Sequence, residues 1–107
     1  MENDILEFIK SCVENRRIFW THHVNVRLKE RYIPAEAILS TLDSYEIIEE
    51  YDENRYFPSY LIYTEYRYEV IHILIAVDRE NCNVRIVTSY KPTIKKWEID
   101  FKTRRVL

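Results

Sequence analysis

The sequence contains no glycine among its 107 residues. Phosphate-binding loops of the Walker and Rossmann types depend on glycine, so nucleotide sites of those two classes are excluded. Glycine is also the usual residue where a turn needs a positive φ angle. We therefore expect the tight turns to use Asn, Asp, Pro or Ser, or to be replaced by longer loops.

Cysteines and long apolar runs are scarce. Cys12 and Cys82 match no metal-binding or redox spacing, which predicts two buried free thiols in a cytosolic protein without a metal site or other cofactor. The longest apolar stretch, Val70–Val77, is too short to cross a bilayer. Glu2 and Asp4 precede the first apolar residues, the opposite of a secretory signal peptide. These features predict a cytoplasmic protein with no membrane association.

Charge is unevenly distributed, although the net charge is only -2. Residues 43–53 hold six acids and no base, whereas residues 16–31 hold five bases and one acid. Residues 85–107 hold seven bases and two acids. Such runs usually form solvated faces, but two basic segments can also combine into a patch that binds phosphate groups.

Length and hydrophobic periodicity predict one α+β domain over residues 1–107. The chain is long enough for one core and too short for two. Helical spacing predicts a first helix over residues 4–15, a second from Thr21 to Arg31 or Tyr32, and a third starting at Pro34. Residues 16–20 form a connector, with room for a brief extended stretch.

The periodicity changes to that of strands from Tyr45 onward. We predict strands over residues 45–51, 60–64, 68–77 and 84–90, with a short final strand around 99–101. The short connectors between the later strands indicate antiparallel hairpins. The expected fold has two or three N-terminal helices packed on one face of a four- to five-stranded, mainly antiparallel sheet.

The second predicted helix carries a row of basic side chains. His23, Arg27 and Arg31 lie four residues apart and therefore share one helix face. One imidazole and two guanidiniums in a row make a reasonable phosphate site. The alternative is a solvated basic stripe whose partners are Glu30 or the acidic strand.

The predicted sheet contributes a second set of candidates. In the strand 68–77, the aliphatic residues at 71, 73, 75 and 77 share the face that should meet the helices, which places His72 on the opposite face. A lone histidine on a strand is more often structural than catalytic. Tyr90 ends the next strand, where it can stack on a base, donate to a phosphate or simply fill the core. The cations and the tryptophan that follow complete the candidates: Lys91, Trp97, Arg104 and Arg105.

Several short motifs resemble those of domain of unknown function 4258, an uncharacterised bacterial and archaeal family. The first is HVNVRLKERYI, from His23 to Ile33. Tyr51 and the segments PSYL (58–61), IHILIA (71–76) and IVTSYKP (86–92) follow, and then Trp97. The resemblance covers about Thr21 to Arg105, but Tyr32 replaces a glycine that is usual in the family.

The family is similar in length and element order to the RelE/ParE-like and MqsR-like toxins of type II toxin–antitoxin pairs. This resemblance implies a RelE/ParE-like fold, a metal-independent endoribonuclease (an mRNA interferase) acting on RNA, and a small cognate antitoxin, often zinc-binding. It assigns catalysis to His23, Arg27, His72 and Tyr90, with a histidine as acid or base and the arginine on the phosphate. Substrate binding falls to Arg31, Lys91, Trp97, Arg104 and Arg105.

Two other hypotheses remain open. The chain is a non-enzymatic protein- or RNA-binding module that uses its basic C-terminal segment, or the histidines are structural and satisfied within the core. The ribonuclease hypothesis requires the His23 face of the helix and the open face of the sheet to meet at one edge.

Overall fold

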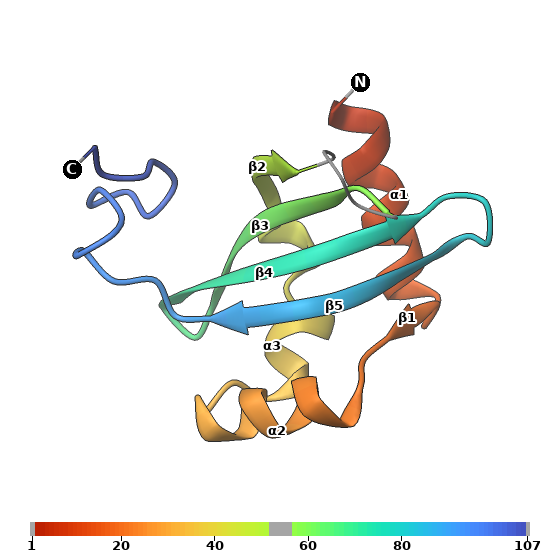
Figure 1. Cartoon of the computed structure of the whole chain (residues 1–107), viewed down its shortest axis with the longest axis horizontal. Coiled ribbons are helices and arrows are strands. Elements are labelled where there is room, and N and C mark those ends of the chain that lie inside the picture. Colours follow the sequence, from red (N-terminus) through yellow and green to blue (C-terminus); the bar gives the residue numbers. More distant parts are fainter. Residues whose placement is uncertain (1, 52–56, 107) are drawn as a thin grey trace.

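The computed structural model describes residues 2–51 and 57–106 and shows an α+β fold (Figure 1). The helices are α1 (Glu2–Glu14), α2 (His22–Glu30) and α3 (Ala35–Leu39), followed by a 3₁₀ turn, η1 (Leu42–Ser44). The strands are β1 (Ile18–Phe19), β2 (Glu46–Tyr51), β3 (Ser59–Tyr66), β4 (Glu69–Asp78) and β5 (Asn83–Tyr90). The predicted loop over residues 52–59 falls largely outside the described residues.

The five strands form one sheet in the order β1-β5-β4-β3-β2. β2 to β5 pair antiparallel, whereas β1 pairs with β5 in parallel. The mainly antiparallel α+β prediction is therefore confirmed, and the connector over residues 16–20 does contain a brief strand. Because β1 pairs with β5 only at Val84 and Arg85, the edge of β5 beyond that point is open to α2.

The prediction of a final strand around residues 99–101 is wrong. Asp100 accepts hydrogen bonds from the backbone N–H groups of Lys102 and Thr103 and so folds the chain into a turn. Phe101 has a φ of 57°, which is incompatible with a strand. The segment makes one isolated bridge instead, between Trp97 and Arg104.

The main core lies between the helices and one face of the sheet. The aliphatic residues of β4 at 71, 73, 75 and 77 are all buried on this face, as their alternation predicts. Thr21 caps the N-terminus of α2, since its hydroxyl accepts from the Val24 N–H, and the helix buries Val24 and Leu28. The C-terminal segment covers part of the opposite face, where Trp97 is only 1% exposed. A second, smaller packed region therefore lies on the side of the sheet that faces away from the helices.

The turns follow the prediction made from the absence of glycine only in part: Asp78 and Asp100 each bond to the backbone of a turn, but other turns use large residues. The β3–β4 turn places Arg67 at φ 51° and Tyr68 at φ 68°, and Tyr32 after α2 has a φ of 57°. At Tyr32 the helix ends in a Schellman motif, because the Ile33 N–H donates to Leu28 O and the Tyr32 N–H to Lys29 O. The chain thus forms left-handed turns with large residues, since packing and hydrogen bonds on either side fix the backbone there.

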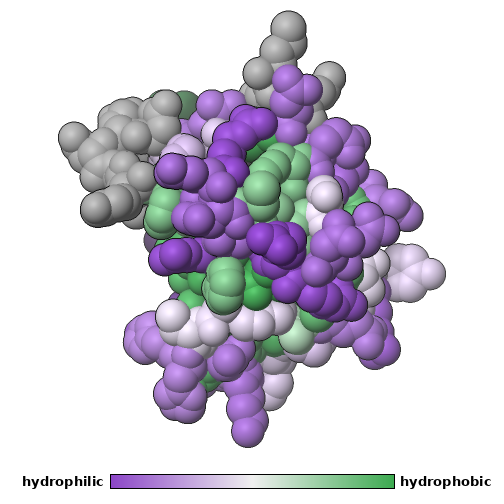
Figure 2. Space-filling model, turned by 90° about the vertical axis from the view of Figure 1, so that its right-hand side faces the viewer, coloured by the Kyte–Doolittle hydropathy of each residue, from purple (hydrophilic) through white to green (hydrophobic). Residues whose placement is uncertain are grey.

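Two further predictions concern the cysteines and membrane association. Cys12 is buried, but Cys82 is exposed in the β4–β5 turn, so the prediction of two buried thiols is wrong for Cys82. None of the described helices has the length and apolar character needed to span a membrane. The end of the molecule seen in Figure 2 is covered mainly by hydrophilic side chains with apolar ones between them, as a solvated face would be.

Candidate functional site

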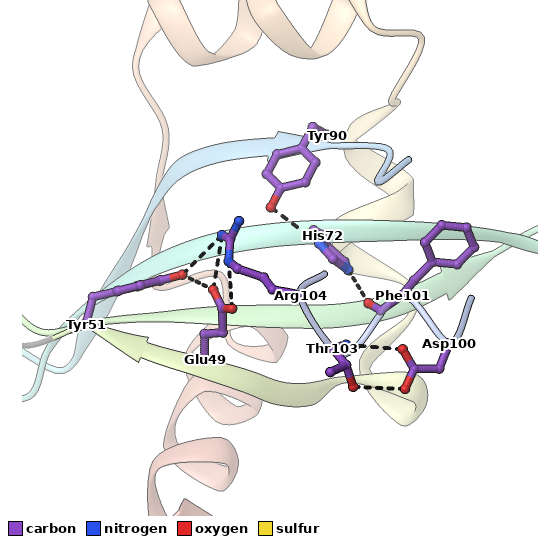
Figure 3. A network of polar contacts seen from close by, with 8 residues as sticks. All are labelled: Glu49, Tyr51, His72, Tyr90, Asp100, Phe101, Thr103 and Arg104. Atoms are coloured by element: carbon purple, nitrogen blue, oxygen red, sulfur yellow. Dashed lines mark hydrogen bonds and ion pairs between the residues drawn. The ribbon is translucent and has the colours of Figure 1, made fainter. Parts of the chain in front are cut away.

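His72 lies in the middle of the smaller packed region and is 0% exposed. Its Nε2 lies 2.7 Å from the carbonyl oxygen of Phe101, and its Nδ1 lies 3.3 Å from the hydroxyl of Tyr90 (Figure 3). The edge of its ring meets Trp97 at a centroid distance of 4.5 Å. Both nitrogens are therefore occupied, and the ring is shielded from solvent.

The two partners of His72 fix its tautomer. A carbonyl oxygen can only accept, so Nε2 carries the hydrogen and donates it to Phe101 O. Burial lowers the pKa of His72, which favours the neutral ring. In that form Nδ1 is an acceptor, so the Tyr90 hydroxyl donates to it. Burial also raises the pKa of Tyr90, so its phenol stays protonated near neutral pH.

Arg104 connects the C-terminal segment to β2. Its Nε lies 2.9 Å from Glu49 Oε2 and its Nη2 lies 3.2 Å from Glu49 Oε1, so the guanidinium pairs with both carboxylate oxygens. Tyr51 donates to the same carboxylate, and Arg104 also stacks 4.6 Å above the ring of Trp97. The carboxylate and the stacked ring hold Arg104 in place, where it lines two of the three hollows described below.

The tail hollow lies where β5 runs into the C-terminal segment and has a volume of about 340 Å³. Its polar lining includes Tyr90 and three cations, Lys91, Lys96 and Arg104. Lys91 is paired with Glu69 at 3.3 Å, whereas no ion pair is found for Lys96 within residues 2–51 and 57–106. The hollow is therefore electropositive at the point where β5 ends.

Arg31 anchors α2 to the edge of β5. Its Nη1 donates to Ser89 O at 2.7 Å and to the hydroxyl oxygen of Thr88 at 3.1 Å. This contact places His23, Arg27 and Arg31 around the α2 hollow, a space of about 100 Å³ completed by β5 residues that include Thr88. His23 and Arg27 are exposed, so the predicted basic face does line a concave surface.

A third space, the sheet hollow, lies on the open face of the sheet between the other two. It has a volume of about 220 Å³ and is lined by Tyr51, Leu61, Leu74, Thr88, Tyr90 and Arg104. It shares Thr88 with the α2 hollow and shares Tyr90 and Arg104 with the tail hollow. The helix face and the open sheet face therefore adjoin along β5, which is the arrangement that the ribonuclease hypothesis requires.

Two of the predicted substrate-binding residues, Trp97 and Arg105, are held by contacts within the protein. Trp97 is buried against His72, and only its border reaches the tail hollow. Arg105 donates to the carbonyls of Ile94 and Trp97 and lies 3.8 Å from a carboxylate oxygen of Glu98. Both residues shape the C-terminal segment around the hollows. The described residues include no group of three or more His, Cys, Asp or Glu placed to hold a metal ion.

Tyr51, Leu61 and Thr88 lie in the family-like motifs of the sequence but were not predicted as site residues, and Glu49 was not singled out at all. Thr88 was detectable in principle, because it precedes Tyr90 by two positions and strand alternation places both on one face. Tyr51 and Glu49 depend on the register between β2 and β3, in which Glu49 pairs with Leu61 after a bulge. A bulge of this kind changes which side chains face the open side, and sequence periodicity did not reveal it.

Comparison with known proteins gives one match. The family described as Domain of unknown function (DUF4258) matches residues 20–91, which run from the residue before the α2 cap to the residue after β5. The matched part contains the α2 hollow and most of the sheet hollow, and it ends before the C-terminal segment. No curated protein and no solved structure matches the chain.

Proposed function

Because the chain belongs to the DUF4258 family, which has no assigned function, we propose an activity from its geometry: endonucleolytic cleavage of RNA. The observation that supports this proposal is the junction at Thr88. There the His/Arg face of α2 adjoins an open sheet face that leads to a cationic hollow. An RNA strand lying along β5 would have proton-transfer and phosphate-binding groups at one end and further cations at the other.

The α2 hollow has the groups that metal-independent cleavage requires. An imidazole can take the proton from the 2′-hydroxyl, whose oxygen then attacks the adjacent phosphorus. The P–O bond to the 5′-oxygen breaks, and that oxygen takes a proton from the imidazolium or from water to leave as a 5′-hydroxyl. We assign the proton transfer to His23 and the stabilisation of the phosphorane charge to Arg27. Arg31 holds α2 against β5 and adds positive charge to the same space.

Tyr90 and His72 have supporting roles in this proposal. Tyr90 lines two hollows and can contact the RNA, but its hydroxyl hydrogen is directed at His72. Since His72 is fully buried, we assign it as a positioning residue that fixes the Tyr90 hydroxyl. Direct proton transfer by His72 or Tyr90 stays a prediction from the sequence.

The test is cleavage of a single-stranded RNA in buffer containing a chelator. Attack by the 2′-oxygen leaves a 2′,3′-cyclic phosphate on one product and a 5′-hydroxyl on the other. We expect His23→Ala and Arg27→Ala each to lower the rate at least about a hundredfold, as removal of a proton-transfer or charge-stabilising group does. If the wild-type protein does not cleave RNA, or His23→Ala cleaves at the wild-type rate, the proposal fails.

Two neighbours on α2 provide matched controls. His22 is exposed and Lys29 is a cation on the same helix, but neither lines the α2 hollow. His22→Ala and Lys29→Ala should therefore cleave at close to the wild-type rate. If cleavage depended only on the overall basic character of α2, the rate would instead fall in all four variants.

A second candidate function is a non-enzymatic RNA-binding module. The observation in its favour is that Lys91, Lys96 and Arg104 surround the tail hollow independently of His23. Under this hypothesis, RNA binds with a strong salt dependence and is not cut. Reversing the charge of Lys96 would abolish binding, while His23→Ala would leave it intact.

The resemblance to RelE/ParE-like and MqsR-like toxins adds a biological role to the proposal. In that role the chain is the toxin of a type II pair, and a small cognate antitoxin silences it. Expression of the chain alone should then arrest growth, and His23→Ala should relieve the arrest.

A further inference from the structure

We infer that the sheet hollow is a nucleobase subsite, in which one unpaired base lies between Tyr51 and Tyr90. The inference rests on the proposed RNA function and extends it by naming the part of the substrate that the open sheet face takes. The inference gives a role to four residues that line the sheet hollow: Tyr51, Leu61, Leu74 and Thr88.

The lining and the volume of the sheet hollow suit a nucleobase. Leu61 and Leu74 are paired across β3 and β4 on the open face, and Tyr51 and Tyr90 come from strands on either side of them. Figure 3 shows both tyrosines and Arg104 on this face. The volume of about 220 Å³ is below the roughly 300–1,000 Å³ of pockets for drug-sized ligands, so it suits a single ring system.

The hydrogen bonds around the hollow leave a donor at Thr88 and an acceptor at Tyr90 for a ligand. The Thr88 oxygen accepts from Arg31, so its own hydrogen is available to donate. The Tyr90 hydroxyl donates to His72, so its oxygen keeps its capacity to accept. Every nucleobase has donors and acceptors side by side on its edge, and so it can satisfy both groups at once.

The neighbouring charges favour a base that is attached to phosphates. The α2 hollow, with Arg27 and Arg31, adjoins the sheet hollow at Thr88. The tail hollow, with Lys91 and Lys96, adjoins it at Tyr90. An apolar slot between two cationic spaces matches the chemistry of a nucleotide chain, in which each base is flanked by phosphates. A free apolar molecule would make no use of these cations.

The experiment measures binding without cleavage. The probes are two fluorescent single strands of equal length with 2′-fluoro groups in place of the nucleophilic hydroxyl. One strand carries bases, and the other is abasic at every position. Stacking of a base on aromatic side chains is worth about 1–3 kcal/mol, so the strand with bases should bind wild-type protein at least about fivefold more tightly.

The test variant is Tyr51→Leu, which removes one aromatic wall and leaves the Glu49–Arg104 pair in place. It should weaken binding of the strand with bases at least about fivefold and leave binding of the abasic strand unchanged. Thr88→Val removes the free donor and one of the two Arg31 bonds, while Arg31 keeps its bond to Ser89 O. It should have the same selectivity with a smaller effect. The matched control is Tyr68→Leu, because Tyr68 is fully exposed in the β3–β4 turn.

The outcomes separate the two proposals. If wild-type protein binds both strands equally, or Tyr51→Leu weakens both equally, the base subsite is overturned while cleavage at the α2 hollow stands. If neither strand binds, the proposed RNA function fails and the subsite fails with it. Selective loss in Tyr51→Leu and Thr88→Val, with none in Tyr68→Leu, supports the subsite.

Discussion

His72 donates its Nε2 hydrogen to the carbonyl oxygen of Phe101 at 2.7 Å, and this bond joins β4 to a segment 29 residues further along the chain. The acceptor residue has a φ of 57°, a conformation that costs roughly 1–2 kcal/mol for a residue with a Cβ atom. The bond, the turn at Asp100 and the burial of Trp97 together hold the C-terminal segment on the open face. Trp97 and Arg104 of this segment line the tail hollow.

Replacement of His72 tests how much its two hydrogen bonds stabilise the protein. His72→Phe keeps an aromatic ring against Trp97 but leaves the Phe101 carbonyl and the Tyr90 hydroxyl without their partner. We expect the free energy of unfolding in urea to fall by about 2–3 kcal/mol. Tyr90→Phe removes only the longer bond and should cost about 1 kcal/mol. Equal losses in the two variants would show that the bond from His72 to Phe101 adds no measurable stability.

The burial of His72 also predicts how stability changes with pH. Because burial lowers the pKa of His72 in the folded chain below its ordinary 6.5, the unfolded chain takes up a proton first as pH falls. The contribution of His72 is thus complete above about pH 6.5 and is lost as pH falls from there toward the folded pKa.

The comparison is between wild type and His72→Gln, unfolded in urea at pH 7.5 and 5.5. Over this interval the wild type should lose more stability than His72→Gln. His22→Gln serves as the control, because His22 is exposed and the buried histidine is intact in that variant. Parallel losses in wild type and His72→Gln would contradict the prediction.

The β3–β4 turn offers a substitution that should stabilise the protein. Tyr68 has a φ of 68° and a fully exposed side chain. Tyr68→Gly removes the steric cost of a Cβ atom in this conformation and should raise the free energy of unfolding by about 1 kcal/mol. Tyr68→Ala keeps the Cβ atom and should change stability little. A gain in the alanine variant equal to that in the glycine variant would exclude the backbone explanation.

The pair between Glu49 and Arg104 should contribute modestly to stability. Half of the Arg104 side chain is exposed, so solvent screens the ion pair despite its contact with both carboxylate oxygens. A double-mutant cycle with Glu49→Gln and Arg104→Gln should give a coupling energy of about 0.5–1 kcal/mol. Raising the salt from 0.1 M to 1 M should reduce it. A coupling near zero at low salt would mean that Trp97 stacking alone holds Arg104.

The order of elements was predictable because it depends on short-range patterns. Alternation in residues 68–77 placed His72 on the face away from the helices, and helical spacing put His23, Arg27 and Arg31 on one side of α2. Thr21 and Pro34 marked the starts of α2 and α3 through ordinary capping preferences. These features follow from the geometry of a single helix or strand and need no knowledge of what packs against it.

Tertiary contacts decided which part of the open sheet face the C-terminal segment covers. The path of residues 91–106 depends on contacts with distant residues, the Phe101 carbonyl with His72 and Arg104 with Glu49. The same contacts allow Phe101 its positive φ, whereas local preference predicted a strand there.

The sequence by itself determined the candidate groups and the faces that carry them, because the period of a helix or strand fixes side-chain direction. It did not determine that the α2 face adjoins Tyr90 at Thr88. That junction depends on where β1 ends along β5 and on Arg31 filling the edge that it leaves. It also did not determine that His72 is enclosed, which requires a segment 29 residues away to cross the sheet. Both are products of long-range packing, which local periodicity does not encode.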